Sequence, residues 1–224
     1  MGLNVMPVNS ERLHDDDWRF HKPDDSGIAT TGRFVRILEV VERVRPAHVL
    51  DIGCGSGYLG AQIKTRQPGA VVDGVDISTV ALERARARLD RVWHLDLDAA
   101  GLPAPAGVYD LVIASEVVEH LYDVQHAAAE IARVLKAGGH AVLTVPNLAY
   151  WRYRLDLLCG RLPLPANDSR HLHQFTAAHF AALGAANGLA LAELFGHSTR
   201  LPVLARRWPA VFSDTLIALF RKPA

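Results

Sequence analysis

The stretch Val49-Leu50-Asp51-Ile52-Gly53-Cys54-Gly55-Ser56-Gly57 decides the fold of this chain. The apolar run 47–52 has the length of a buried parallel strand, and a helical pattern begins at Tyr58. The glycines between them leave no side chain between the main chain and a ligand. A strand, a glycine turn and a helix in this order predict a nucleotide-like ligand beside the helix N-terminus.

The acid in this motif narrows the class of ligand. The glycine spacing is G-x-G-x-G, whereas the dinucleotide-binding fingerprint is G-x-G-x-x-G. A carboxylate at Asp51, just before the first glycine, would repel a pyrophosphate and attract a cation. The motif therefore disfavours an NAD-dependent oxidoreductase and favours a cationic ligand. A tight turn that Asp51 merely caps is the plainer alternative.

Strand and helix patterns alternate after the glycine turn. Strands are expected over residues 71–77, 91–96, 108–114 and 139–145, with two further strands over 189–195 and 215–220. Helices are expected over residues 31–44, 78–89, 124–135 and 177–186, with Ser78 and Thr176 as caps of the second and the last. This alternation predicts a doubly wound α/β fold.

Two of the strands end in an acid that could contact a nucleoside. Asp76 ends the second strand, and its two carboxylate oxygens could accept both hydroxyls of a ribose. Asp96 ends the third strand and could accept a hydrogen bond from an adenine amine. Its plainer alternative is a solvated loop acid next to Asp98.

Together these motifs resemble a class I S-adenosylmethionine-dependent methyltransferase. The resemblance is carried by residues 51–57, 74–76, 96, 109–121 and 135–139, and it spans about residues 30–147. It implies a Rossmann-like, seven-stranded sheet whose last strand is antiparallel. The Pro-Asn-Leu junction at 146–148 looks closest to the MetW/UbiG-like branch of the family.

The resemblance also implies S-adenosylmethionine as the cofactor. The glycine loop would hold its amino-acid part, Asp76 its ribose, and Asp96 with the Leu97 N–H its adenine, while Tyr58 would cover one face. The expected cofactor-binding residues are Asp51, Gly53, Cys54, Gly55, Gly57, Tyr58, Asp76, Ile77, Asp96, Leu97 and Ser115.

The catalytic candidates follow the fourth strand. Glu116, Glu119 and His120 would lie on one side of a helical turn, because their spacing is i, i+3 and i+4. With His171 or His173 they would offer two oxygens and two nitrogens, a set that suits Mn²⁺ or another transition metal better than Mg²⁺.

This Glu-Val-x-Glu-His run resembles the metal site of small-RNA 3′-terminal 2′-O-methyltransferases, and also the quinone O-methyltransferase UbiG. Around the second histidine only Arg170-His171-x-His173-x-Phe175 matches the RNA enzymes. We therefore expect no metal, with His120 or His173 as a general base or an acceptor-binding group. Were a metal present, Glu116, Glu119, His120 and His173 would be its ligands.

The chain is expected to form a single domain over residues 1–224. Residues 1–26 are polar and acid-rich and predict an arm, in which His14 and His21 would be exposed. Residues 147–175 interrupt the alternation after the fifth strand. Because ligands bind at the carboxyl ends of strands in such sheets, this insert is expected to be the acceptor lid.

The amino-acid composition limits which classes of partner the sequence favours. The formal net charge is zero, with 24 basic and 24 acidic residues, so no global field favours nucleic acid or an anionic membrane. Two cysteines give no disulfide framework, and no leader or membrane-spanning run is apparent, so a cytoplasmic location is expected.

We expect methylation of a hydroxyl on a small molecule. The alternatives are a catalytically silent S-adenosylmethionine-binding regulatory partner and a metal-dependent RNA 2′-O-methyltransferase; the oligomeric state is left open.

Overall fold

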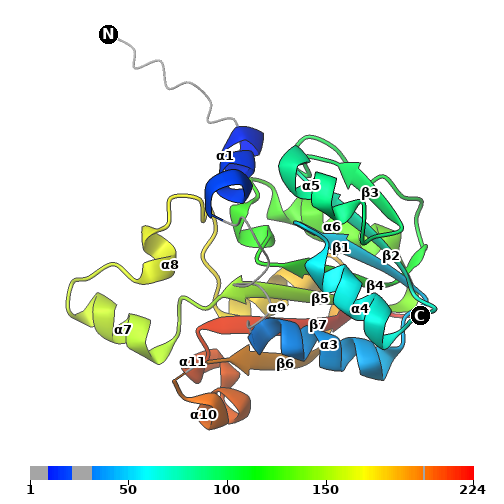
Figure 1. Cartoon of the computed structure of the whole chain (residues 1–224). Coiled ribbons are helices and arrows are strands. Elements are labelled where there is room, and N and C mark those ends of the chain that lie inside the picture. Colours follow the sequence, from blue (N-terminus) through cyan, green and yellow to red (C-terminus); the bar gives the residue numbers. More distant parts are fainter. Residues whose placement is uncertain (1–9, 22–31, 199) are drawn as a thin grey trace.

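The computed structural model describes residues 10–21, 32–198 and 200–224. Every strand in these ranges belongs to one seven-stranded sheet with the order β3-β2-β1-β4-β5-β7-β6 (Figure 1). The strands are β1 (His48–Ile52), β2 (Val71–Asp76), β3 (Arg91–His94), β4 (Tyr109–Ser115), β5 (Leu135–Pro146), β6 (Ala190–His197) and β7 (Thr215–Arg221).

The first five strands are parallel, and β7 is antiparallel to both β5 and β6. The predicted doubly wound sheet with an antiparallel last strand is thus confirmed. The strand order reverses between β1 and β4, and the crevice at their carboxyl ends is where open α/β sheets bind ligands.

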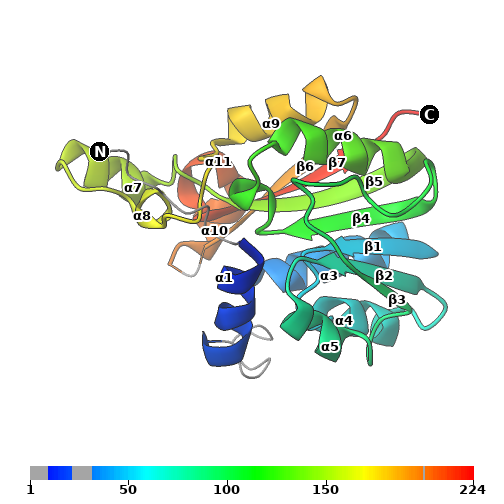
Figure 2. The same cartoon turned by 90° about the horizontal axis from the view of Figure 1, so that it is seen from above.

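Helices cover both faces of the sheet (Figure 2). On one face lie α3 (Gly32–Val44), α4 (Tyr58–Arg66) and α5 (Thr79–Ala85), and on the other lie α6 (Val124–Val134) and α9 (Ala177–Ala186). Two separate buried apolar clusters result, one on each face. The central strand β1 supplies both, because successive side chains of a strand point to opposite faces: Val49 packs in one cluster and Leu50 in the other.

Side-chain caps fix where the helices begin. The Ser78 hydroxyl accepts a hydrogen bond from the Ala81 N–H at 3.1 Å, and the Thr176 hydroxyl accepts one from the His179 N–H at 3.4 Å. Both caps were predicted from the sequence. The helix after Ser78 ends at Ala85 rather than at Leu89, because the chain there tightens into turns.

The insert 147–175 lies beyond the carboxyl ends of the strands and carries α7 (Trp151–Leu158) and α8 (Leu164–Asn167) (Figure 1). Helix α7 extends away from the sheet and buries none of its residues. The short helix α8 forms because Pro165 stands in its first turn, where the fixed proline φ suits a helix. Two further short helices, α10 (Pro202–Arg207) and α11 (Pro209–Phe212), connect β6 to β7.

The described part of the N-terminal arm packs on the sheet domain. It consists of α1 (Ser10–Asp16) and the π-helical turn η1 (Asp17–His21). The Asp15 carboxylate accepts hydrogen bonds from the Ser78 and Thr79 hydroxyls at 2.6 and 3.0 Å, and from the Val80 N–H at 3.2 Å. Burial would raise the pKa of Asp15, but these hydrogen bonds hold it below its usual value. The arm therefore supplies an anionic cap to α5.

The expectation that His14 is exposed is wrong, because this arm places it at a cavity described below. The side chain of His21, and residues 1–9 and 22–26 of the arm, lie outside the described residues. Within the described ranges, no helix combines the length and the apolar character needed to cross a bilayer.

Replacing Asp15 by alanine is expected to destabilise the fold, because α5 loses its anionic cap. Loss of such a cap costs about 1–2 kcal/mol, which corresponds to a decrease in melting temperature of about 2–8 °C for a chain of this size. Scanning calorimetry of Asp15→Ala and wild type measures this decrease in melting temperature. The neighbouring substitution Asp16→Ala is the control, and equal decreases in both variants would contradict the capping role.

Candidate active site

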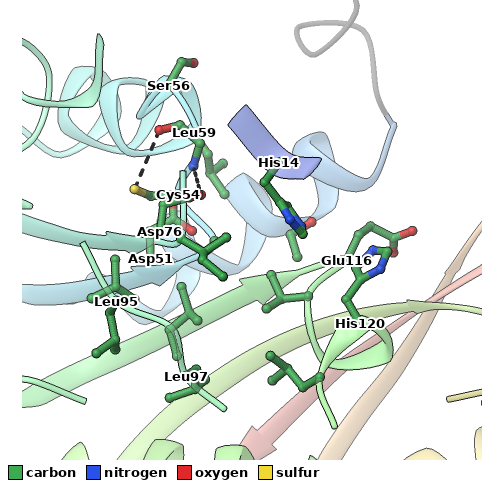
Figure 3. A pocket seen from close by; sticks show the side chains of 18 of the residues that line it. His14, Asp51, Cys54, Ser56, Leu59, Asp76, Leu95, Leu97, Glu116 and His120 are labelled. Atoms are coloured by element: carbon green, nitrogen blue, oxygen red, sulfur yellow. Dashed lines mark hydrogen bonds between the residues drawn. The ribbon is translucent and has the colours of Figure 1, made fainter. Parts of the chain in front are cut away.

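A cavity of about 280 Å³ opens at the carboxyl ends of β1, β2 and β4 (Figure 3). All of the expected cofactor-binding residues except Gly57 line it. Gly57 has φ 75° and precedes α4. A Cβ atom there would lie 3.1 Å from the Cα of Ala85 and the Cγ of Leu89. Gly57 therefore allows the turn to pack against α5, and its expected place beside a ligand is corrected.

The glycine turn is tied to the tip of β2. The Gly53 N–H donates to the Val75 carbonyl oxygen at 2.8 Å, and the Gly55 N–H donates to Asp76 Oδ2 at 2.8 Å. Gly55 has φ 54°, and a Cβ atom there would lie 2.4 Å from the ring of Trp18. The arm thus covers the glycine turn closely, and only glycine fits beneath it.

Asp51 lines this cavity as a buried carboxylate that has no counter-ion in the described part of the chain. It is 3% exposed, and burial, with the nearby negative charge of Asp76, raises its pKa to about 8. None of the described residues donates a hydrogen bond to it or places a cation beside it. An unpaired buried charge is costly, so this position fits a ligand that brings a positive group, such as the ammonium of S-adenosylmethionine.

Asp76 and Asp96 line the cavity farther out. Asp76 Oδ1 accepts from the Ser78 N–H at 2.8 Å in addition to the bond from Gly55. Asp96 Oδ1 accepts from the Asp98 N–H at 3.0 Å, and Leu97 supplies an apolar wall. The ribose and adenine contacts of these residues stay predictions.

Glu116 stands at the opposite end of the cavity in a strained conformation. Its φ is 57°, which is uncommon for a residue with a side chain and typical of functional sites. Thr144 holds it there: the Glu116 N–H donates to the Thr144 carbonyl oxygen at 3.2 Å, and Glu116 Oε1 accepts from the Thr144 hydroxyl at 2.8 Å. Burial raises the pKa of Glu116, against the opposing effect of the Arg33 guanidinium.

The expected helical turn through Glu116, Glu119 and His120 is wrong. The sharp turn at Glu116 is followed by a short 3₁₀ helix, η2 (Val118–His120), because Val118 turns into the core. His120 lines the cavity, whereas Glu119 points into the protein interior and is 1% exposed. Burial and the charge of Glu116 raise the pKa of Glu119 well above its usual range.

The two histidines of the insert have different surroundings. The His171 ring lies 4.8 Å from the His120 ring, centroid to centroid. His173 instead places Nε2 3.2 Å from the Tyr122 carbonyl oxygen, and its backbone N–H donates to the Glu119 carbonyl oxygen. His173 lines neither described cavity. The expected set with His173 is therefore not assembled, and His171 takes the place beside His120.

A second cavity of about 630 Å³ lies between the insert and the sheet. Its wall from the insert includes Tyr153, Pro165 and His171, and its wall from the sheet includes Pro146 and Thr215. Glu116 lines this cavity as well as the first one.

Several residues of the first cavity were not predicted from the sequence, among them residues of the arm and of α3. His14 and Trp18 come from the arm, and Arg33 and Phe34 come from the first turn of α3. Arg33 Nε is buried and has no hydrogen-bond partner among the described residues. One indication of Arg33 was present in the sequence: it lies in the first turn of the amphipathic helix that precedes β1 and the glycine turn.

Comparison with known proteins agrees with this geometry. The chain is 34% identical over 112 residues to demethylmenaquinone methyltransferase of Thermus thermophilus, covering 48% of this chain and 51% of the relative. It is 32% identical over 143 residues to 27-O-demethylrifamycin SV methyltransferase of Amycolatopsis mediterranei, covering 59% and 50%. The chain spans about half the length of these curated relatives.

A solved TehB-like S-adenosylmethionine-dependent methyltransferase from Corynebacterium glutamicum has the same fold. The TM-score is 0.64 at 20% identity, over 94% of this chain and 99% of that one. Residues 31–194 match the methyltransferase domain family. The chain therefore belongs to the family of S-adenosylmethionine-dependent methyltransferases.

Proposed function

We propose that this protein transfers a methyl group from S-adenosylmethionine to a hydroxyl of a small molecule. The observation that carries the proposal is the meeting of two cavities at Glu116. An acceptor held beneath the insert would approach the first cavity at Glu116, across from Asp51 and Asp76 (Figure 3). The insert 147–175 then acts as the acceptor lid that its position beyond the strand ends suggests.

The residues of the first cavity suit the parts of the cofactor. Asp51 would pair with the ammonium group, Asp76 with the ribose, and the Arg33 guanidinium, whose Nε is buried, with the carboxylate. When bound, the cofactor supplies a methyl group that is already activated by the sulfonium. The protein therefore contributes mainly alignment of the acceptor oxygen and exclusion of water.

The chain must also accept a proton. The acceptor hydroxyl would lose its proton to a base of the protein as it takes the methyl group, for which the sulfur of a bound cofactor would be the leaving group. Glu116 lines both cavities and has a pKa raised by burial, so it is the proton acceptor in this proposal. His120 stands beside it at the cofactor cavity. Glu119 and His173, which line neither cavity, do not contact the acceptor here.

The names of the relatives support a small-molecule acceptor. One relative acts on demethylmenaquinone and another on 27-O-demethylrifamycin SV, and the latter name places the methyl group on oxygen. The zero formal charge of this chain gives no support to an RNA acceptor. A silent cofactor-binding partner would have no use for the second cavity.

Incubation with S-adenosylmethionine carrying a deuterated methyl group, and a small-molecule extract of the source organism, tests the function. Mass spectrometry is expected to find a small molecule that gains one labelled methyl group on oxygen. Glu116→Gln is expected to lower this labelling about 100-fold, with the affinity for S-adenosylhomocysteine retained. Absence of any labelled small molecule with wild-type protein would favour the silent partner.

Cofactor binding is expected to depend on the protonation of Asp51. With a pKa of about 8 in the free protein, Asp51 is protonated at pH 7, and an ammonium group favours its ionised form. Binding of S-adenosylhomocysteine at pH 7 should therefore release a proton, and affinity should rise between pH 6 and 8. Calorimetry in two buffers of different ionisation enthalpy measures this release. Asp51→Asn should abolish it, whereas Asp96→Asn should not.

The same pKa has a consequence for stability. The Asp51 pKa is raised from 3.8 to about 8 in the folded protein, so between these values the folded state binds more protons than the unfolded chain. The cofactor-free protein should therefore lose stability as pH rises through this range. Asp51→Asn should melt at a higher temperature than wild type at pH 8, and a lower melting temperature would contradict the unpaired carboxylate.

Arg33 is expected to recognise the carboxylate of the cofactor. A charged hydrogen bond of this kind contributes about 1.5–3 kcal/mol, so Arg33→Gln should weaken S-adenosylhomocysteine binding roughly 10- to 150-fold. Methylthioadenosine lacks the amino-acid part, and its affinity should be the same for both proteins. Equal weakening of both ligands would instead indicate that Arg33 only supports the structure.

A further inference from the structure

Three side chains at the border of the two cavities present ligand atoms to one another. Glu119, His120 and His171 each offer one such atom, and these atoms all lie within 4.8 Å of one another. His120 lines the cofactor cavity and His171 lines the second cavity. From this arrangement we propose that Glu119, His120 and His171 bind one divalent transition-metal ion.

The Glu119 carboxylate is the first argument for a cation. Its side chain is 1% exposed, and neither of its oxygens has a hydrogen-bond partner among the described residues. Buried polar groups are normally hydrogen-bonded, and an orphaned one needs an explanation such as an ion. The nearest imidazole nitrogen, His120 Nε2, lies 4.0 Å from Glu119 Oε1, too far for a hydrogen bond.

That separation suits a shared ion. Ligand atoms bound to zinc lie about 2.0–2.2 Å from the metal, so two of them on one ion are roughly 3–4 Å apart. The 4.0 Å between Glu119 Oε1 and His120 Nε2 is at the upper end of this range. A small movement of either side chain would complete the coordination.

The orientation of the two imidazoles is the second, independent argument. His120 Nδ1 lies 3.0 Å from the Arg170 carbonyl oxygen, and His171 Nδ1 lies 3.0 Å from the Pro165 carbonyl oxygen. A carbonyl oxygen only accepts, so each Nδ1 must donate, and the lone pair of each neutral ring is then on Nε2. Metal-binding histidines are held by backbone carbonyls in this way.

The donor set indicates the class of ion. Two imidazole nitrogens and one carboxylate oxygen suit Zn²⁺, Mn²⁺ or Co²⁺, whereas Mg²⁺ prefers oxygen ligands. Three protein ligands leave a coordination position for water or a substrate oxygen. Asp168 is close to His171, at 3.8 Å, but Arg170 holds its carboxylate through two hydrogen bonds.

This set differs from the one expected from the sequence. The Glu116 carboxylate accepts a hydrogen bond from the Thr144 hydroxyl, and His173 Nε2 lies against the Tyr122 carbonyl oxygen. An ion held by Glu119, His120 and His171 would adjoin both cavities and would lower the pKa of an acceptor hydroxyl. That catalytic role rests on the proposed function, whereas the binding of the ion does not.

The test is calorimetric titration of Zn²⁺ into the metal-free, tag-free full chain. Wild type is expected to bind one ion per chain. His171→Ala should weaken binding at least tenfold, and His173→Ala, only two residues away, should leave it unchanged. Co²⁺ bound to wild type should give ligand-field absorption bands that His171→Ala loses.

The affinity for S-adenosylhomocysteine shows that each variant is folded, because neither His171 nor His173 lines the cofactor cavity. If His171→Ala fails to fold, Glu119→Gln takes its place in the titration and should likewise weaken Zn²⁺ binding at least tenfold. Absence of stoichiometric binding by wild type, or loss in His173→Ala rather than His171→Ala, would overturn the proposal. Because the readout is metal binding, a failure of methyl transfer would count against the proposed function alone.

Discussion

The unpaired carboxylate of Asp51 at the end of β1 is the constraint on which the rest of the site depends. A buried carboxylate with a pKa of about 8 disfavours the folded state at neutral pH, so the surrounding structure must hold it in place. Strand β1 does so because it lies inside the sheet with apolar clusters on both faces. In the proposed function a cationic group of the cofactor would offset the cost of burying Asp51, which would couple the stability of the protein to cofactor binding.

Much of this could be predicted from the sequence because its signals are contiguous. An apolar strand, an acid and a glycine turn occupy residues 47–57, and each feature has a local physical meaning. The seven-stranded sheet and its antiparallel last strand followed from the resemblance and are confirmed. Gly57 shows the limit of such reasoning, because its positive φ serves helix packing rather than a ligand.

The catalytic end could not be predicted in the same way. The spacing of Glu116, Glu119 and His120 fits a helix, but the left-handed backbone at Glu116 depends on Thr144 of β5. The periodicity of the sequence does not predict the contact between Glu116 and Thr144. Likewise, His171 and His173 differ by two positions, and only the fold of the insert shows which one faces His120. The arm residues His14 and Asp15 reach their places by long-range packing, for which a polar segment gives no signal.

The two ends of the site therefore follow different physical rules. The proposed cofactor contacts lie on β1, β2 and the turn between β1 and α4, where hydrogen bonds within the backbone and to Asp76 fix the geometry. The wall that would face the acceptor in the proposed function comes largely from the insert, whose helix α7 buries none of its side chains. Side chains without such restraint can change without disturbing the sheet. The acceptor of this chain should thus be set by residues 147–175 and by Glu116, not by the motif that identifies the family.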